Sequence, residues 1–141
     1  MKILVATDGS KNALRAVKFA IMLDQSLKAR GSITLISVHD DTALRHAQRF
    51  VGKKAVDEYL RDLSEADLVP ARRLLDKAGA RHDMIIRTGH VASEIAAAAT
   101  TGKFEMIVLG CKGRSALKDL LIGSVAHRVS ELAKTPVTLI K

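Results

Sequence analysis

The chain is poor in several residue types whose absence limits what it can be. Its 141 residues include one cysteine, Cys111, two prolines and no tryptophan. A single cysteine excludes an intramolecular disulfide and a zinc cluster built from cysteines, and it fits a reducing compartment. No apolar run approaches the roughly 18 residues that span a bilayer, and the apolar residues 3–6 give way at once to a polar turn. We therefore expect a cytoplasmic protein that is neither secreted nor inserted in a membrane, and that has no membrane partner.

Length and composition are those of an ordinary globular domain. Hydrophobic residues make up 48% of the chain and charged residues 27%. A chain of this length buries a sizeable core within one domain. Because no internal repeat, low-complexity tract or linker interrupts it, we expect a single domain over residues 1–141.

The formal net charge of +8 favours anionic partners. Half of this charge falls within residues 110–141, which hold six basic and two acidic residues: Lys112, Arg114, Lys118, Arg128, Lys134, Lys141, Asp119 and Glu131. A solvated basic surface accounts for most of them equally well. Nucleic acid is a disfavoured partner, because the chain has only four aromatic residues and no helix-turn-helix or zinc pattern.

Strand-like and helix-like segments alternate along the chain. Short apolar runs predict strands over 2–7, 33–38, 82–87, 105–109 and 136–140. Helical spacing predicts helices over 11–30, capped by Ser10, over 43–79 with an interruption near Pro70, over 91–101, and around 125–133. Such alternation predicts the α/β class, with one open parallel sheet that carries helices on both faces.

A glycine-rich segment follows the fourth predicted strand, where ligands of open parallel sheets bind. It reads Gly110-Cys111-Lys112-Gly113, then nine residues, then Gly123-Ser124 at the start of the last helix. Glycines let backbone N–H groups approach an anion, and a helix N-terminus adds unpaired donors and a favourable dipole. Lys112 and Arg114 add positive charge, which suits a polyphosphate. A tight turn followed by a plain helix cap explains the same residues, and neither a Walker A sequence nor a dinucleotide fingerprint is present.

The spacing Gly-x2-Gly-x9-Gly-Ser resembles the nucleotide-binding signature of the universal stress protein family. The start, residues 3–10, and the end, residues 124–137, are also similar to that family, so the resemblance covers the whole chain. It implies five parallel strands in the order 3-2-1-4-5, a Rossmann-like sheet of the adenine nucleotide alpha hydrolase type. Two departures are Val91, where the family often has proline, and Pro70 within a helix that is usually unbroken.

The same resemblance implies a site for ATP, or for AMP or ADP, with Mg²⁺ or Mn²⁺ accompanying the phosphates. Asp8 would lie near the ribose or a phosphate-bound metal, and Val38 would contact adenine through its backbone. The full set of implied or neighbouring site residues is Ala6, Thr7, Asp8, Val38, Leu109, Gly110, Lys112, Gly113, Arg114, Gly123, Ser124 and Val125. We expect no catalytic residue among them.

The resemblance also implies a homodimer, for which the apolar edge strand 136–140 offers an antiparallel pairing surface. The leading hypothesis is a nucleotide-binding regulatory protein of the stress response. Two alternatives stay open: a slow metal-dependent ATPase that uses Asp8, and a family member that acts through protein contacts without nucleotide. Cys111 is interpreted as a neutral loop residue, His127 as exposed, and His39 as a residue at the pocket rim without an assigned role.

Overall fold

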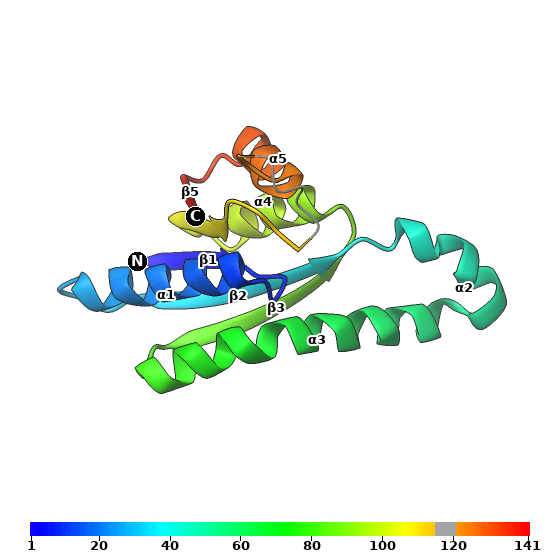
Figure 1. Cartoon of the computed structure of the whole chain (residues 1–141), viewed down its shortest axis with the longest axis horizontal. Coiled ribbons are helices and arrows are strands. Elements are labelled where there is room, and N and C mark those ends of the chain that lie inside the picture. The colour runs from blue at the N-terminus through cyan, green and yellow to red at the C-terminus, as the bar shows by residue number, and fades with distance from the viewer. Residues whose placement is uncertain (115–120) are drawn as a thin grey trace.

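A parallel sheet organises the chain (Figure 1). The computed structural model describes residues 1–114 and 121–141, so Lys118 and Asp119 of the basic segment lie outside the described residues. In the described part, five strands pair in the order β3-β2-β1-β4-β5 and every pairing is parallel. The strands are β1 (Lys2–Ala6), β2 (Ser32–His39), β3 (His82–Thr88), β4 (Met106–Gly110) and β5 (Val137–Ile140). The predicted order is confirmed, and the predicted strand limits differ by one residue at most.

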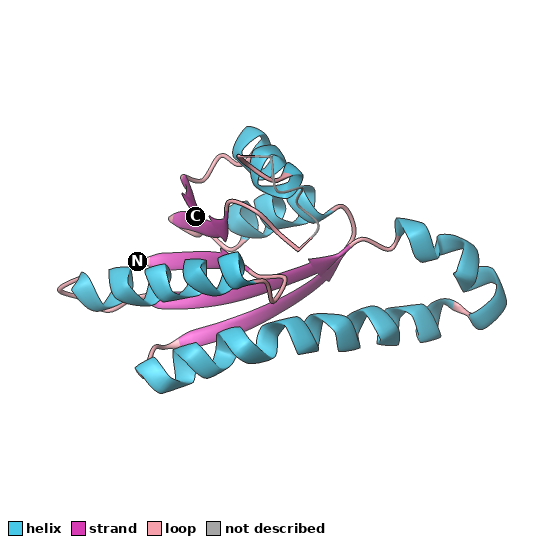
Figure 2. Ribbon diagram, in the orientation of Figure 1, coloured by secondary structure: helices cyan, strands magenta, loops and turns pink. Residues whose placement is uncertain are grey.

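Helices cover both faces of this sheet, as predicted (Figure 2). Helices α1 (Lys11–Ser26) and α3 (Lys53–Ala78) pack on one face, and α4 (Val91–Thr101) and α5 (Ser124–Leu132) on the other. Consecutive residues of β1 point alternately into the two layers: Ile3 and Val5 toward α1 and α3, Leu4 toward α4 and α5. Burial on both faces explains why this strand is a continuous apolar run.

Helix α1 begins as predicted and ends earlier. The Ser10 hydroxyl accepts the N–H of Ala13 at 3.2 Å, which caps the helix N-terminus. The helix ends at Ser26 rather than at residue 30, because the buried carboxylate of Asp24 accepts the N–H of Gly31 at 2.7 Å. That bond turns the chain back toward β2.

The prediction that Pro70 interrupts a helix is wrong. Helix α3 passes through Pro70 without a break, and Leu68, Ala71 and Leu75 on either side of it are buried in the core under α1. Burial of these residues offsets the proline penalty of about 3 kcal/mol. The break lies instead at Gly52, whose φ of 86° and ψ of 156° separate α2 (Arg45–Val51) from α3. Only glycine adopts such dihedral angles readily.

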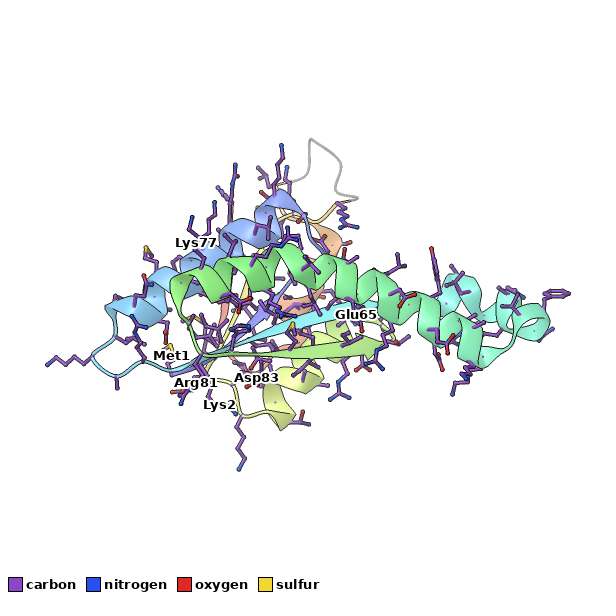
Figure 3. All side chains as sticks on the ribbon, turned by 90° about the horizontal axis from the view of Figure 1, so that it is seen from below. Met1, Lys2, Glu65, Lys77, Arg81 and Asp83 are labelled. Atoms are coloured by element: carbon purple, nitrogen blue, oxygen red, sulfur yellow. The ribbon has the colours of Figure 1, made fainter. Side chains whose placement is uncertain are left out.

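The N-terminal part of α3 extends beyond the sheet together with α2 and the short 3₁₀ turn η1 (Thr42–Leu44) (Figures 1 and 3). In Figure 3 the helix runs from Lys77 past Glu65 and continues outward from there. We call residues 42–63 the arm. Val56 and Leu60 are buried where α2 packs against α3. Among the described helices, none combines the length and the apolar character needed to cross a membrane.

Candidate functional site

A cavity of about 450 Å³ opens at the carboxyl ends of β1, β2 and β4, against the N-terminus of α5. In a sheet of this order, β1 and β4 flank the point where the strand order reverses, which is where such folds bind ligands. All twelve residues that the sequence singled out line this one cavity: Ala6, Thr7, Asp8, Val38, Leu109, Gly110, Lys112, Gly113, Arg114, Gly123, Ser124 and Val125.

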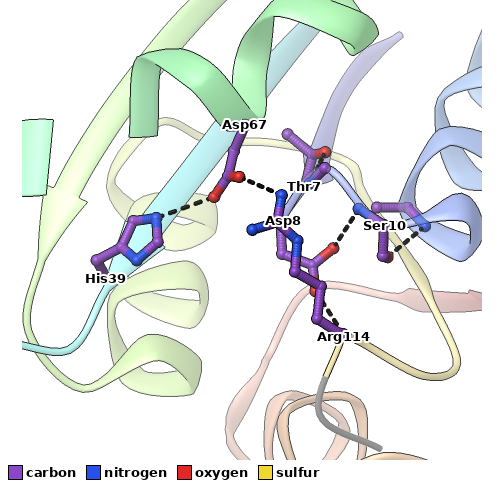
Figure 4. Close-up of polar contacts among 8 residues, drawn as sticks. Thr7, Asp8, Ser10, His39, Asp67 and Arg114 are labelled. Atoms are coloured by element: carbon purple, nitrogen blue, oxygen red, sulfur yellow. Dashed lines mark hydrogen bonds and ion pairs between the residues drawn. The ribbon is translucent and has the colours of Figure 1, made fainter. Parts of the chain in front are cut away.

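Asp8 holds two loops together at the mouth of the cavity (Figure 4). Its Oδ1 accepts the backbone N–H of Ser10 at 2.9 Å, within the turn between β1 and α1. Its Oδ2 accepts the backbone N–H of Arg114 at 3.1 Å, from the loop after β4. The carboxylate therefore joins segments 106 residues apart in the sequence.

Gly110 and Gly113 are required by protein contacts. A Cβ at Gly110 would lie 2.8 Å from the carbonyl carbon of Asn12 and 2.9 Å from its Cβ, so α1 packs directly on this backbone. A Cβ at Gly113 would lie 2.8 Å from Oδ2 of Asp8. The sequence argument gave these glycines two explanations, an open approach for an anion or a tight turn. The structure supports the second, because the loop closes tightly on α1 and Asp8.

The N-terminus of α5 faces the cavity. The N–H of Gly123 donates to the carbonyl of Cys111 at 2.7 Å, which docks the start of the helix against the glycine-rich loop. The first intrahelical bond runs from the N–H of His127 to the carbonyl of Gly123. The N–H groups of Ser124, Val125 and Ala126 precede it and have no helical acceptor. These three residues line the cavity, where such donors favour an anion.

Asp67 is a cavity residue that sequence reasoning missed. It lies on α3 with a side chain only 4% exposed, and its Oδ2 is 2.9 Å from Nε2 of His39. Its Oδ1 accepts from Nη2 of Arg114 at 2.6 Å (Figure 4). A buried carboxylate needs such partners, because desolvation penalises an unpaired charge. One signal was present: Asp67 occupies the buried stripe of α3, four residues before Ala71.

His39 and Asp40 also line the cavity, at the end of β2 and just after it. His39 was given no role, yet it is half-buried and bonded to Asp67. The pKa of Asp40 lies below its ordinary value, because the side-chain hydroxyl and the backbone N–H of Thr42 bond to the carboxylate. The cavity wall thus combines the carboxylates of Asp8, Asp40 and Asp67 with the cationic Lys112 and Arg114.

The described residues contain no group of three or more histidine, cysteine or acidic side chains that could hold a metal ion. Each carboxylate oxygen of Asp8 already accepts one backbone N–H, and one further lone pair on each is left for another ligand. A metal here would therefore take most of its ligands from phosphate and water. Cys111 is buried and its backbone N–H donates to the carbonyl of Ile140, while His127 is exposed, as expected.

Comparison with known proteins identifies relatives along the entire chain. The model of the "Universal stress protein family" matches residues 1–141. The "Universal stress protein YxiE" of Bacillus subtilis is 30% identical, and the match covers 99% of this chain and 98% of that protein. Among solved structures, "hypothetical protein MJ0577" of Methanocaldococcus jannaschii superimposes with a TM-score of 0.86 at 25% identity, over 99% of this chain and 94% of that one.

A further fold relative is the universal stress protein from Archaeoglobus fulgidus, solved in complex with dAMP. It has a TM-score of 0.69 and 24% identity, over 100% of this chain and 98% of that one. The family match over all 141 residues agrees with the strand order and with the glycine spacing after β4. This chain belongs to the universal stress protein family.

Proposed function

We propose that the chain is a regulatory protein of the stress response that binds an adenine nucleotide, ATP above all, in the cavity at the ends of β1, β2 and β4. One observation carries the proposal: a single cavity joins an apolar wall to the N-terminus of α5. The apolar wall suits a purine ring, and the helix N-terminus suits a phosphate chain. The volume of about 450 Å³ lies within the ordinary range of small-molecule sites.

The apolar wall suits the base. Ile36, Val38, Val91, Ile95 and Leu109 line it from β2, α4 and β4. In the proposed pose the adenine lies against these side chains, and the backbone of Val38 supplies polar contacts to its edge. Ala6 and Thr7 at the end of β1 leave room for the ribose, close to Asp8. The A. fulgidus relative, solved with dAMP, supports an adenine nucleotide as the ligand.

The opposite wall suits the phosphates. The N–H groups of Ser124 and Val125, the Ser124 hydroxyl and the cations of Lys112 and Arg114 would bind the phosphate oxygens. Arg114 is 61% exposed and its guanidinium is bonded to Asp67, so a phosphate chain would compete with that carboxylate for it. A Mg²⁺ or Mn²⁺ ion carried by the nucleotide would neutralise phosphate charge near Asp8, and the remaining Asp8 lone pairs could accept a metal-bound water.

Hydrolysis of ATP is the weaker alternative. It requires a group that accepts a proton from water. His39 is the histidine that lines this cavity in the described residues, and with its Nε2 bonded to Asp67 only its Nδ1 is left for that role. Turnover of labelled ATP that Asp8→Ala abolishes would establish the enzyme. Absence of turnover together with tight binding would support the regulatory protein.

The test of nucleotide binding is calorimetry with ATP, ADP, AMP and adenosine, preceded by mass spectrometry of what co-purifies with the protein. Ser124→Glu is the sharpest variant, because the residue is exposed and an acidic residue in the first turn stabilises a helix. It should lower ATP affinity at least tenfold without lowering stability. Ser130→Glu, on the same helix but away from the cavity, is the matched control.

If neither ATP nor any of the other three ligands binds the unaltered protein, nucleotide binding fails and the family member acts through protein contacts alone. If Ser124→Glu and Ser130→Glu bind ATP equally well, the phosphate position at α5 is wrong.

We also infer a homodimer that forms through β5 in the cytoplasm. Strand β5 pairs with β4 on one side and is the last strand of the sheet, so its other edge can pair with a second copy. The single cysteine fits a reducing compartment. Light scattering after size exclusion tests the dimer. Leu139→Pro should shift it to monomer, because the register with β4 directs the N–H of Leu139 to the free edge of β5. A monomeric unaltered protein at micromolar concentration contradicts it.

A further inference from the structure

The arm carries a segment of one charge sign. Residues 42–56 contain Arg45, Arg49, Lys53 and Lys54, together with His46, and no aspartate or glutamate. All four cationic residues are exposed. None of the four lines the cavity, so the proposed nucleotide site gives them no role.

The cations surround an exposed apolar pair. Phe50 is 90% exposed and Val51 is 61% exposed, and both lie beside Gly52, where the chain turns from α2 into α3. A single exposed phenylalanine is common, but here it is next to a second exposed apolar residue, at the junction of α2 and α3. Figure 1 shows these two helices meeting at the outer end of the arm. An apolar tip with basic flanks is typical of elements that bind a membrane surface.

Internal ion pairs leave most of this charge available. Arg45 lies 3.6 Å from Asp41 and Lys54 lies 3.9 Å from Glu58, and both pairs are open to solvent, where such contacts are weak. Within the described residues, Arg49 and Lys53 make no ion pair. The two side chains closest in sequence to Phe50 and Val51 are thus cations without an acidic partner.

We propose that the tip of the arm docks on an anionic lipid surface, with Phe50 and Val51 at the interface and Arg45, Arg49, Lys53 and Lys54 against the headgroups. An anionic bilayer satisfies both features at once: its headgroups attract the cations and its interface accepts the apolar pair. An acidic groove or a nucleic-acid backbone would satisfy the charge and leave Val51 in water. A lipid surface is also broad and flat, so it can meet a tip that projects from the molecule.

This docking differs from the membrane contact that the sequence argued against. That argument rested on the absence of a spanning segment, and a peripheral tip needs none. The inference also stands apart from the nucleotide site, because no residue of the tip lines the cavity. Failure of one therefore leaves the other intact.

The chain has no tryptophan, so Phe50→Trp places a single fluorescent reporter at the tip. With vesicles of phosphatidylcholine and phosphatidylglycerol, its emission should shift to the blue, and brominated lipid should quench it. The shift should be absent with phosphatidylcholine alone and should weaken as salt rises. Met22→Trp, on α1 at a side chain 58% exposed, is the matched control and should show neither shift nor quenching.

Two double variants separate the contribution of the charges from that of the apolar pair. Lys53→Gln with Lys54→Gln should lower vesicle partitioning on the order of tenfold, since each cation near an anionic surface contributes several-fold. Phe50→Ser with Val51→Ser should lower it as well, and circular dichroism should show both pairs folded, because all four side chains are exposed.

Three results would overturn the proposal: no blue shift of Phe50→Trp with anionic vesicles, an equal shift of Met22→Trp, or partitioning that both double variants leave unchanged. Binding of the tip to duplex DNA without binding to vesicles would assign the surface to nucleic acid instead.

Discussion

The cavity and the arm share helix α3 and are built in opposite ways. At the cavity, residues distant in the sequence hold one another in place: Arg114 binds Asp8 and Asp67, and Asp67 binds His39. In the arm, the ion pairs join residues four apart, such as Lys54 and Glu58. A region held by non-local contacts opens only when the whole fold unfolds, whereas a region held by local contacts can open by itself. The difference predicts where substitutions unfold the protein.

The largest loss of global stability is expected for a substitution at Gly110. A methyl group there would press on the backbone of Asn12 in α1, and such overpacking typically costs about 1–3 kcal/mol. Gly110→Ala should therefore lower the urea midpoint clearly. Gly123→Ala is the matched control, because a Cβ there would meet its nearest atom at 3.4 Å, an ordinary contact. Equal midpoints for the two variants would mean that α1 is not tightly seated on the loop.

The next effect concerns Asp67. Asp67→Asn removes the charge from its bonds to Arg114 and His39 and should cost about 1–2 kcal/mol of unfolding free energy. Arg114→Gln should cost less, since its side chain is mostly in solvent. A double-mutant cycle should give a coupling of about 1 kcal/mol, the upper range for a pair with one exposed partner. Strictly additive effects would show that the ion pair contributes nothing.

A smaller loss of global stability is expected for a substitution at Gly52, in the arm. Its dihedral angles strain any residue with a Cβ by about 1–3 kcal/mol. Opening of the arm relieves that strain, so Gly52→Ala should speed hydrogen exchange within residues 42–63 and hardly move the urea midpoint. A midpoint lowered as far as in Gly110→Ala would abolish the contrast between arm and cavity.

The smallest change in stability is expected at Thr42, where the arm meets the cavity. Thr42, the first residue of the arm, lowers the pKa of Asp40 through its hydroxyl and its N–H. A folded-state pKa below the ordinary 3.8 stabilises the fold above that pH, and the contribution is lost as the pH falls through the folded-state pKa. Thr42→Val should raise the pKa of Asp40 toward its ordinary value, as measured by carboxyl carbon shifts in NMR. An unchanged pKa would mean that the hydroxyl contributes nothing and that the backbone N–H and the nearby charges of His90 and Arg45 lower it.

The sequence predicts the parallel sheet and the loops at the ends of its strands well. Five strand-like runs alternating with helical segments predict a parallel sheet, and the three central strands β2, β1 and β4 are apolar because they are buried on both faces. The cavity residues on loops were identifiable too, since Asp8, Gly110 and Gly123 follow or precede regular elements at the carboxyl ends of strands. Short-range patterns report such positions directly.

Asp67 and Pro70 show what such patterns leave out. Asp67 reaches the cavity from the middle of α3, and its role depends on partners 28 and 47 residues away. Pro70 stays helical because its neighbours are buried, which is a tertiary effect. Gly52 differs from these two, because a glycine is itself a local signal and adopts dihedral angles that break a helix. For Asp67 and Pro70 the deciding interactions lie outside the local window.

The unbroken course of α3 has a mechanical consequence. Its 26 residues make a rod of about 39 Å. From Ser64 onward the helix is held in the core by Leu68, Ala71 and Leu75, whereas the outer half packs against α2 and contributes no residue to that core, so the rod is a lever whose fulcrum lies near Asp67. A displacement of the arm would therefore pass along one continuous helix to Asp67, the residue that bonds to His39 and Arg114.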